Sequence, residues 1–396
     1  MKYSSLVDRV KGDAADVWDS HYRAQVDQSR GEDVIVLSVG DPDFSTPEGI
    51  TDAASSALRH GDTHYTPVVG VEAFRENIAK RYCSEFGDDI TADNVIVTSG
   101  AQNALFVASM CLTEKDDEVI VLQPMYVTYE ATVQASGATL VPVVLDEPNG
   151  FRLNAENLKA AITSKTKAIF FATPSNPTGI SLNQSELELI ADLAIEHDLW
   201  VVSDEVYSDL VFDSEFFHIA SLPGMAERTI TIGSLSKSYA MTGWRIGWAL
   251  GPQEFIDNAA KLALCMLYGL PGFLQQGGIY ALENAQKDIV NMREAYRSRR
   301  DLLIHQFESI PGLKSLKPDA GMFLMVDVRG TGLTAPEFVT QLYEHSKVSV
   351  LDATAFGASA KGYVRISYTV DESILLDASH RIATFVNCLH STQKRP

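Results

Sequence analysis

From about residue 94 to residue 251, short runs of β-branched and aliphatic residues alternate with helical patterns, such as the amphipathic stretch at 185–197. This alternation is typical of a parallel sheet with helices on both faces, because parallel strands need a crossover of helical length between them. The sequence therefore predicts an α/β fold whose mostly parallel sheet has seven strands, at 95–98, 118–122, 140–145, 168–172, 199–203, 229–232 and 246–250.

The C-terminal third of the chain has a different pattern. A charged helical segment is followed by three short strand-like runs and a closing helix, at 288–310, 321–328, 348–351, 363–368 and 371–389. The first 44 residues are too few to fold alone. We therefore predict a large domain at 45–285 and a smaller α+β domain formed by both chain ends, 1–44 and 286–396.

The composition limits the partners of this chain. Its 52 acidic and 32 basic residues give a formal net charge of -20, which repels phosphate backbones and anionic lipid. The longest unbroken hydrophobic run, 262–268, is far shorter than a membrane span, and the N-terminus has no signal-peptide core. We expect neither nucleic acid nor a membrane as a partner.

Cysteine and histidine spacing disfavours the common disulfide and metal scaffolds. The four cysteines lie far apart and form no CxxC pair, which favours a reducing cytoplasm. His60 and His64 have i, i+4 spacing, but Gly61 lies between them and no third ligand is near in the sequence. We therefore expect no metal site.

The segment around Lys237 is the most informative. Lys237 follows a predicted buried strand, has Ser234 and Ser236 beside it, and precedes Arg245. The serines and the arginine can hold a phosphate while the lysine meets an aldehyde of the same molecule, so Lys237 is a candidate Schiff-base lysine. A lone lysine is more often a solvated surface residue, and other segments must decide between these interpretations.

Two other predicted strands end in polar residues that suit the same ligand. Asp204 ends one strand, and a buried carboxylate there needs a positive partner such as a protonated pyridine nitrogen. Tyr207 can donate a hydrogen bond to a ring oxygen. Asn176, in a turn after the strand at 168–172, has donors and acceptors for a ring hydroxyl and a substrate carboxylate. Taken alone, Asp204 is equally a helix cap and Asn176 an ordinary turn residue.

A fourth segment suits a phosphate. Gly100, Ala101 and Gln102 join the strand at 95–98 to a predicted helix, and backbone N–H groups at a helix N-terminus bind phosphate. All four segments follow strands of one predicted sheet, where open α/β folds bind their ligands. Together they predict a site for a phosphorylated aldehyde whose ring has a protonated pyridine nitrogen and a hydroxyl, and the resemblance described next implies that this ligand is pyridoxal 5′-phosphate.

These segments, with Ser38-Val-Gly40-Asp-Pro-Asp-Phe and Val364-Arg365-Ile-Ser-Tyr, resemble class I aminotransferases of pyridoxal-phosphate fold type I over nearly the whole chain. The resemblance implies a homodimer with shared active sites that moves an amino group from an L-amino acid to a 2-oxo acid by a ping-pong mechanism. It implies that Lys237 forms the Schiff base and that Asp204 pairs with the pyridine nitrogen. It also implies ring-oxygen contacts from Tyr207 and Asn176, and phosphate contacts from Gly100, Ala101, Gln102, Ser234, Ser236 and Arg245.

The same resemblance assigns further residues. Arg365 matches the arginine that grips the substrate α-carboxylate, for which a planar guanidinium suits two parallel hydrogen bonds, and Gly40 lies on the substrate side. Tyr126 matches the aromatic residue that stacks on the ring. Tyr65 resembles the tyrosine that reaches the neighbouring subunit's phosphate. Residues 269–272 contain no hydroxyl where family members often place one, which departs from the family pattern.

The substrate is less constrained. Aspartate-type members commonly have a lysine where this chain has Gln102, and a neutral amide weakens the dicarboxylate interpretation. The segments at 18–23, 41–44, 262–269 and 321–323 resemble members that use arginine as donor and pyruvate as acceptor. Asp19 is the candidate carboxylate for a guanidinium, with Asp41 and Asp43 as weaker choices. An aspartate- or aromatic-type aminotransferase and a carbon–sulfur β-lyase remain alternatives, because the same lysine, aspartate and arginine serve them.

Overall fold

The computed structural model describes residues 1–10, 18–86 and 90–393. All seven predicted strands are present, as β2 (Val95–Thr98), β3 (Glu118–Gln123), β4 (Thr139–Val144), β5 (Thr166–Ala172), β6 (Trp200–Asp204), β7 (Thr229–Ser234) and β8 (Gly247–Leu250). They form one sheet in the order β2-β8-β7-β6-β5-β3-β4. β8 is antiparallel to both neighbours and the other pairs are parallel, which confirms the predicted mostly parallel sheet.

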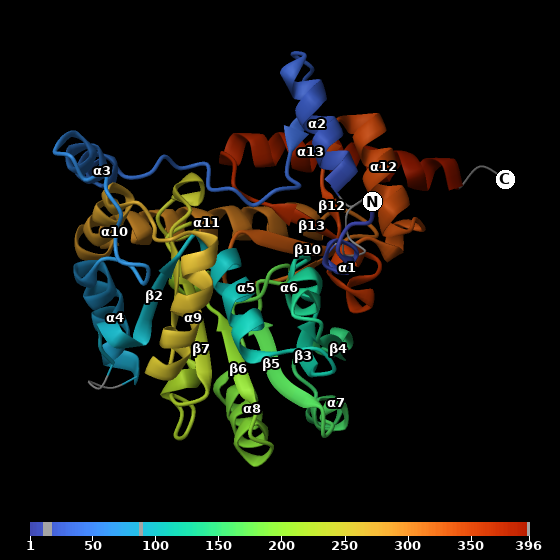
Figure 1. The fold of residues 1–396 in the computed structure, drawn as a ribbon. Coiled ribbons are helices and arrows are strands. Elements are labelled where there is room, and N and C mark those ends of the chain that lie inside the picture. The colour runs from blue at the N-terminus through green and yellow to red at the C-terminus, as the bar shows by residue number, and fades with distance from the viewer. Residues whose placement is uncertain (11–17, 87–89, 394–396) are drawn as a thin grey trace.

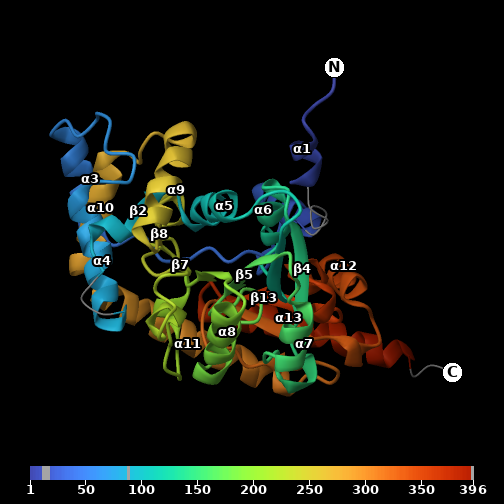
Figure 2. The same cartoon turned by 60° about the horizontal axis from the view of Figure 1, so that its bottom comes forward.

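Helices cover both faces of this sheet (Figure 2). One face packs against α5 (Ala101–Leu112), α6 (Tyr129–Ala135) and α9 (Gln253–Met266), and the other against α7 (Ala155–Ala161) and α8 (Gln184–Glu196). Successive strand residues point to opposite faces, so Val119 joins the first core and Ile120 the second. Because both faces are buried, the strands consist of nearly continuous hydrophobic runs.

The C-terminal part of the chain forms a smaller lobe above the sheet edge in Figure 1. Its antiparallel sheet has the order β12-β13-β10-β9, from β9 (Lys314–Leu316), β10 (Phe323–Asp327), β12 (Leu351–Asp352) and β13 (Tyr363–Ser367). A separate hydrophobic core joins this sheet to α11 (Gln286–Glu308), α12 (Ala335–Ser346) and α13 (Glu372–Gln393).

The N-terminal segment contacts both parts of the molecule. In α1 (Ser5–Arg9), Arg9 Nε donates to the Gln134 carbonyl of α6, 3.1 Å away. Further along, α2 (Asp19–Ser29) packs by the smaller lobe, and β1 (Ile35–Val36) pairs in parallel with β11 (Val348–Ser349). The domain boundaries at 45 and 285 stay a prediction.

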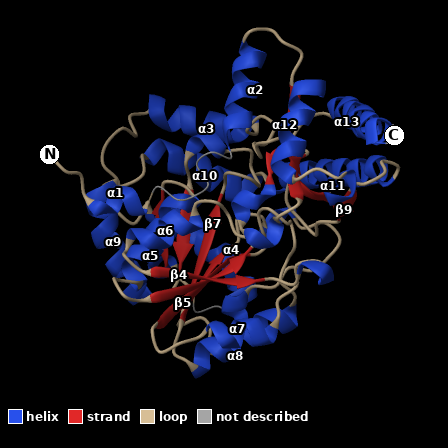
Figure 3. Cartoon of the chain, turned by 90° about the vertical axis from the view of Figure 1, so that its right-hand side faces the viewer, coloured by secondary structure: helices blue, strands red, loops and turns tan. Residues whose placement is uncertain are grey.

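The remaining helices lie around these layers. At the β2 edge of the large sheet, α3 (Glu48–Arg59), α4 (Glu72–Phe86) and α10 (Gly272–Asn284) pack together (Figure 1). Figure 3 shows the strands of the large sheet in red with helices, in blue, around them. Short 3-10 helices occupy Ala92–Asn94, Glu147–Asn149, Ser208–Leu210, Ile219–Ser221, Thr242–Trp244, Arg329–Thr331, Ala353–Phe356 and Ala358–Ala360.

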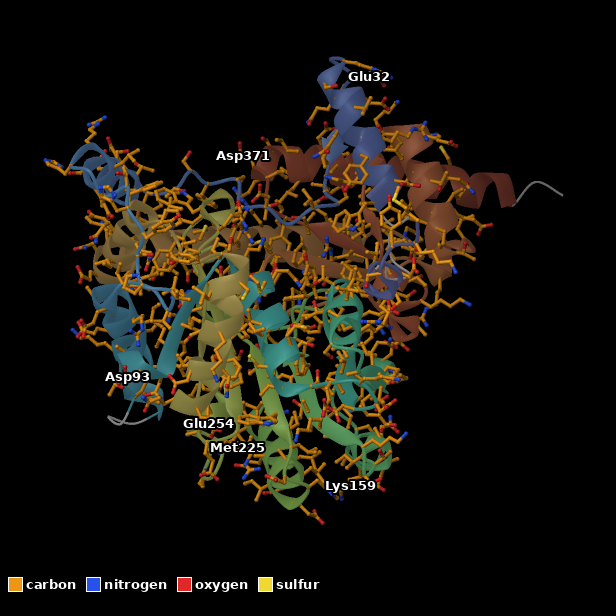
Figure 4. All side chains as sticks on the ribbon, viewed as in Figure 1. Glu32, Asp93, Lys159, Met225, Glu254 and Asp371 are labelled. Atoms are coloured by element: carbon orange, nitrogen blue, oxygen red, sulfur yellow. The ribbon has the colours of Figure 1, made fainter. Side chains whose placement is uncertain are left out.

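Side chains fill the space between the sheet, the helices and the smaller lobe (Figure 4). Charged side chains such as Glu32, Asp371, Lys159 and Glu254 lie on the outside of this packing (Figure 4). Within the described ranges, no helix is both long and apolar enough to cross a membrane.

Candidate active site

The sheet topology brings the predicted polar residues to one edge. The carboxyl ends of β3, β5, β6 and β7 share this edge because these strands are parallel, and β2 joins them because β2 and β7 are both antiparallel to β8. The antiparallel β8 begins at the same edge, just after Arg245. A cavity of about 310 Å³ lies there, lined by Trp18, Val39, Gly40, Ala101, Gln102, Leu105, Tyr126, Thr128, Ala172, Asn176, Asp204, Val206, Tyr207, Ser234, Ser236, Lys237, Thr242, Arg245, Phe323 and Arg365.

Lys237 follows β7 and points into this cavity. Its Nζ donates to the Gly40 carbonyl oxygen, 2.8 Å away. Burial lowers the pKa of Lys237 to about 8; the positive charges of Arg365 and Arg245 add to this effect, and Asp41 opposes it. The amine therefore exchanges a proton readily near neutral pH, as a group that moves protons must.

Asp204 ends β6 and is buried. Its Oδ2 accepts a hydrogen bond from the Tyr129 hydroxyl at 2.7 Å, and its Oδ1 accepts one from the Val206 N–H at 3.3 Å. Burial raises the pKa of Asp204 to about 6. Among the described residues, no cationic side chain forms an ion pair with this carboxylate. A buried carboxylate without a cation fits a ligand that supplies the positive charge.

Arg365 on β13 is a buried cation without a carboxylate. Nη1 donates to Asn176 Oδ1 at 2.8 Å and Nη2 to the Ser38 carbonyl at 2.9 Å. Nε is buried and has no hydrogen-bond partner in the part of the chain that the structure describes. The guanidinium lies over the rings of Phe323 and Phe356, at 4.1 and 4.9 Å from their centroids, and burial lowers its pKa to about 10. This arrangement can receive a carboxylate.

Tyr207 lies between these groups. It is buried, and burial raises the pKa of its hydroxyl, so the hydroxyl stays a donor. Its ring meets Phe323 edge to face, with centroids 6.2 Å apart, and its hydroxyl is hydrogen-bonded to Asn176. Asn176 therefore connects Tyr207 to Arg365.

A second group of residues that line the cavity can bind an anion. Gly100 caps α5 with φ of 79°, and a β-carbon there would collide with the Arg245 guanidinium, so only glycine lets this arginine reach the helix N-terminus. Ser234 and Ser236 place their hydroxyl oxygens 2.9 Å apart beside it. A helix N-terminus, two hydroxyls and a guanidinium converge, which suits a phosphate.

Comparison with known proteins agrees with this geometry. The family model for aminotransferase class I and II matches residues 32–382. The chain belongs to this family. It is 49% identical to the arginine–pyruvate transaminase AruH of Pseudomonas aeruginosa, over 97% of this chain and 98% of that protein. It is 36% identical to an aspartate aminotransferase of Pyrococcus horikoshii, over 89% of this chain and 91% of that protein. The structure of Thermus thermophilus aspartate aminotransferase with maleate has a TM-score of 0.92 at 35% identity, covering 97% of this chain and 100% of that chain.

Membership of the family confirms the predicted fold type, the aminotransferase activity and the pyridoxal-phosphate cofactor. Substrates of the family are amino acids and keto acids. The residues of this aminotransferase fit the cofactor, since the glycine at the N-terminus of α5 leaves room for Arg245 and the buried Asp204 carboxylate pairs with no cation in the described part of the chain. The individual residue roles stay predictions.

Some predicted residues lie outside the cavity of the aminotransferase. The Tyr65 side chain is 87% exposed and contacts the Tyr268 ring, 4.8 Å away between centroids. It lines a second cavity together with residues 269–272. Asp19 is exposed at the start of α2 and does not line the main cavity, although its neighbour Trp18 does.

The remaining candidates are engaged with other side chains. Asp43 forms a two-pronged ion pair with Arg299, at 2.8 and 2.9 Å. Asp41 accepts a hydrogen bond from Thr242 at 2.7 Å, beside the cavity. Gln102 accepts from the Thr128 hydroxyl at 2.6 Å and donates to Thr132 at 2.8 Å. Both ends of the Gln102 side chain are thus tied to α6 or the turn before it.

Sequence reasoning missed three contributors to the site. Tyr129 donates to Asp204, and Trp18 and Phe323 line the cavity. Tyr129 lies three residues after the predicted ring-stacking residue Tyr126, and the two rings meet edge to face with centroids 6.3 Å apart. No local pattern marks Trp18 or Phe323, since each reaches the cavity from a distant part of the chain.

Proposed function

We propose that this aminotransferase takes its amino group from arginine or another basic or neutral L-amino acid and transfers it to a 2-oxo acid, with pyruvate as the preferred acceptor. The observation that carries the proposal is Arg365, a buried guanidinium in the cavity that has, among the described residues, no hydrogen-bond partner for Nε and no carboxylate beside it. Such a group is suited to a substrate carboxylate. The 49% identity to an arginine–pyruvate transaminase supports the choice of donor and acceptor.

Each residue then has one task. When bound, pyridoxal phosphate supplies the aldehyde carbon and an electron-accepting ring. Lys237 Nζ would remove a proton from the substrate Cα and deliver it to the aldehyde carbon of the cofactor, which its lowered pKa permits. Asp204 balances the charge of the ring nitrogen, and Tyr207 and Asn176 hold the ring oxygen.

The other lining residues orient the two ligands. Arg365 fixes the substrate carboxylate and so sets which bond at Cα faces Lys237. Gly100, Ala101, Gln102, Ser234, Ser236 and Arg245 hold the phosphate, Tyr126 stacks on the ring, and Gly40 closes the substrate side.

A guanidinium substrate needs a carboxylate near the mouth of the cavity. Among the described lining residues the one carboxylate is Asp204, which the cofactor uses in this proposal. Asp19 and Asp41 each adjoin a lining residue, Trp18 and Gly40, and either can approach a long cationic side chain. Asp43 is neutralised by Arg299 and is the weakest candidate.

The active unit in this proposal is a cytoplasmic homodimer. Tyr65, Leu264, Met266 and Tyr268 expose large apolar surfaces near the C-terminal end of α9, and a second copy of the chain would cover them and place Tyr65 near the partner's phosphate. Widely spaced cysteines without a CxxC pair suit the cytoplasm. A Tyr65→Asp and Tyr268→Asp double variant should sediment as a monomer; an unchanged dimer would contradict this interface.

Two related activities compete with this proposal. Relatives named aspartate and aromatic-amino-acid aminotransferases are 36% identical, but Gln102 offers a distal carboxylate a neutral amide already bound at both ends. A carbon–sulfur β-lyase would use the same lysine and arginine. It is distinguished by release of pyruvate and ammonia from cystathionine without an added keto acid.

The test is a panel of amino donors with pyruvate as acceptor. Arginine should give the highest kcat/KM, and one alanine should form for each arginine consumed. If arginine performs no better than glutamate, phenylalanine or aspartate, the proposal of a basic donor is wrong, while turnover of any donor upholds the transaminase assignment.

A further inference from the structure

The first turn of α6 connects three parts of the cavity. Tyr126, just before the helix, lines the cavity, and Thr128 and Thr132 bind the Gln102 side chain of α5. Tyr129, at the first position of α6, reaches Asp204 at the end of β6. One helical turn therefore touches the ring-stacking residue, the phosphate turn and the carboxylate.

The contact between Tyr129 and Asp204 is short and enclosed. Tyr129 is 2% exposed and Asp204 is 6% exposed, and the distance from hydroxyl to Oδ2 is 2.7 Å. Burial raises the pKa of the Tyr129 hydroxyl well above its usual range, so it stays protonated and donates. The Val206 N–H engages Oδ1 more weakly, at 3.3 Å, which leaves an acceptor position on the carboxylate for another donor.

We propose that Tyr129 is a positioning residue that keeps Asp204 ionised and aimed at the ring nitrogen of the cofactor. The inference rests on the proposed pairing of Asp204 with that nitrogen. A hydrogen bond to the charged form of a carboxylate favours that form, and it also fixes the rotation of the carboxylate plane.

The other groups around Asp204 do not substitute for this hydroxyl. Tyr126 and Tyr207 interact with the Asp204 carboxylate only through longer-range electrostatics. Among the described residues, the hydrogen bonds to this carboxylate come from Tyr129 and Val206. Glu205, the adjacent carboxylate, raises the pKa of Asp204 and is itself held by His218, with 2.6 Å between Oε2 and Nδ1. Burial and Glu205 thus favour protonation, and Tyr129 with the Val206 N–H opposes it.

The test measures cofactor binding in place of turnover. For the cofactor-free full chain, the dissociation constant of pyridoxal phosphate is followed by tryptophan fluorescence between pH 5.5 and 8.5. In the natural chain, affinity should fall as pH decreases through the Asp204 titration. Tyr129→Phe should move the midpoint of that fall upward by about one pH unit and weaken binding about threefold at pH 6.5.

A second substitution should shift the pH midpoint of cofactor binding in the opposite direction. Incorporation of 3,5-difluorotyrosine at position 129 keeps the hydroxyl and makes it a stronger donor, so the midpoint should move downward. This substitution also serves if Tyr129→Phe does not fold. Tyr296→Phe is the matched control, since Tyr296 is a buried tyrosine whose hydroxyl has no hydrogen-bond partner among the described residues, and its midpoint should equal that of the natural chain.

The outcomes separate this inference from the proposed function. An unchanged midpoint in folded Tyr129→Phe, or an equal shift in Tyr296→Phe, overturns the positioning role. Asp204→Asn tests the underlying pairing: if it binds the cofactor as tightly as the natural chain at every pH, the role of Asp204 is wrong, whatever Tyr129 does.

Discussion

Buried arginines occur in two regions of the molecule, and different groups face them. On α11, Arg299 pairs with Asp43, and Arg300 pairs with Asp213 at 2.7 Å and Asp301 at 2.8 Å. In the cavity, Arg365 is equally buried but contacts an amide oxygen and a backbone carbonyl, with no carboxylate in ion-pair distance among the described residues.

The difference separates structural cations from ligand-binding ones. Removing a guanidinium from water costs several kcal/mol, which a nearby carboxylate offsets. The α11 arginines receive that compensation from the chain itself, and Arg299 thereby ties the segment around Asp43 to the smaller lobe. Arg365 receives no such compensation from the described residues, which supports the proposal that its guanidinium binds an anionic ligand. Lys237, with its pKa lowered to about 8, belongs to the same class.

The largest effect expected concerns Lys237. In the proposed mechanism, Lys237→Ala removes both the amine that would bind the cofactor and the group that would move the proton, so kcat/KM should fall at least about 10⁴-fold. Stopped-flow turnover and the visible absorbance of the cofactor-bound lysine measure this. Lys261→Ala, an exposed lysine on α9, is the matched control and should behave as the natural enzyme. Retention of absorbance and turnover in Lys237→Ala would refute the assignment.

The second effect compares the two arginine regions directly. Arg365→Met should lower kcat/KM about 10³-fold, because the substrate carboxylate loses its cation, and should leave stability unchanged or higher. Arg299→Met should do the reverse: it leaves Asp43 unpaired and costs on the order of 2 kcal/mol of unfolding free energy, with a smaller change in kcat/KM.

Steady-state kinetics and denaturant unfolding of both variants give the comparison. If Arg365→Met destabilises the chain as much as Arg299→Met does, the distinction between structural and ligand-binding arginines fails for this molecule.

The third effect concerns Asp204, a buried carboxylate that, like Arg365, has no oppositely charged partner among the described residues. The pKa of Asp204 is about 6 in the folded chain against 3.8 for an ordinary aspartate, which corresponds to roughly 3 kcal/mol lost by the cofactor-free fold as pH rises through this range. Because the folded pKa is raised, the cost is absent below about pH 4 and complete above about pH 6. Asp204→Asn should therefore stabilise the cofactor-free chain at pH 7 but not at pH 4.

Denaturant unfolding of the cofactor-free protein at several pH values checks this expectation. The control substitution is Asp198→Asn, at a carboxylate that is 97% exposed. A stability difference for Asp204→Asn that is the same at pH 4 and pH 7 would contradict the raised pKa.

The fold was predictable where the signal is local. Each strand of the large sheet is a hydrophobic run, and the catalytic candidates lie at or just after the ends of such runs, as Asp204 ends β6 and Lys237 follows β7. Since parallel strands share an edge, the convergence of these residues follows from the pattern. The direction of β8 does not, because a short hydrophobic run has the same composition in either direction.

Contacts between distant segments were not predictable. The Tyr129–Asp204 bond joins residues 75 positions apart, and the Asp43–Arg299 pair joins residues 256 apart. The sequence therefore could not show that Asp43 is already neutralised, nor that Asp19 is exposed beside the cavity while Trp18 lines it. Choosing among the three carboxylates needed the folded positions of their partners.

The smallest effect concerns those carboxylates. Asp43 forms an ion pair with Arg299 and so belongs with the paired charges of α11. Asp43→Asn should therefore change the free energy of unfolding more than the choice of amino donor. Asp19 and Asp41 lie on the cavity side, where a cationic substrate gains from an exposed carboxylate only about 1 kcal/mol. If one of these two carboxylates contacts the guanidinium of the substrate, its substitution by Asn should lower kcat/KM for arginine about fivefold. The same substitution should leave kcat/KM for alanine unchanged.

The ratio of kcat/KM for arginine to that for alanine isolates this contribution, because a general loss of activity cancels in it. A drop confined to Asp41→Asn would place the guanidinium on the Gly40 side of the cavity, next to Thr242, which binds Asp41. A drop confined to Asp19→Asn would place it under the start of α2. If neither variant changes the ratio, groups other than these two carboxylates bind the substrate side chain. In the proposed homodimer, such groups can come from the second subunit.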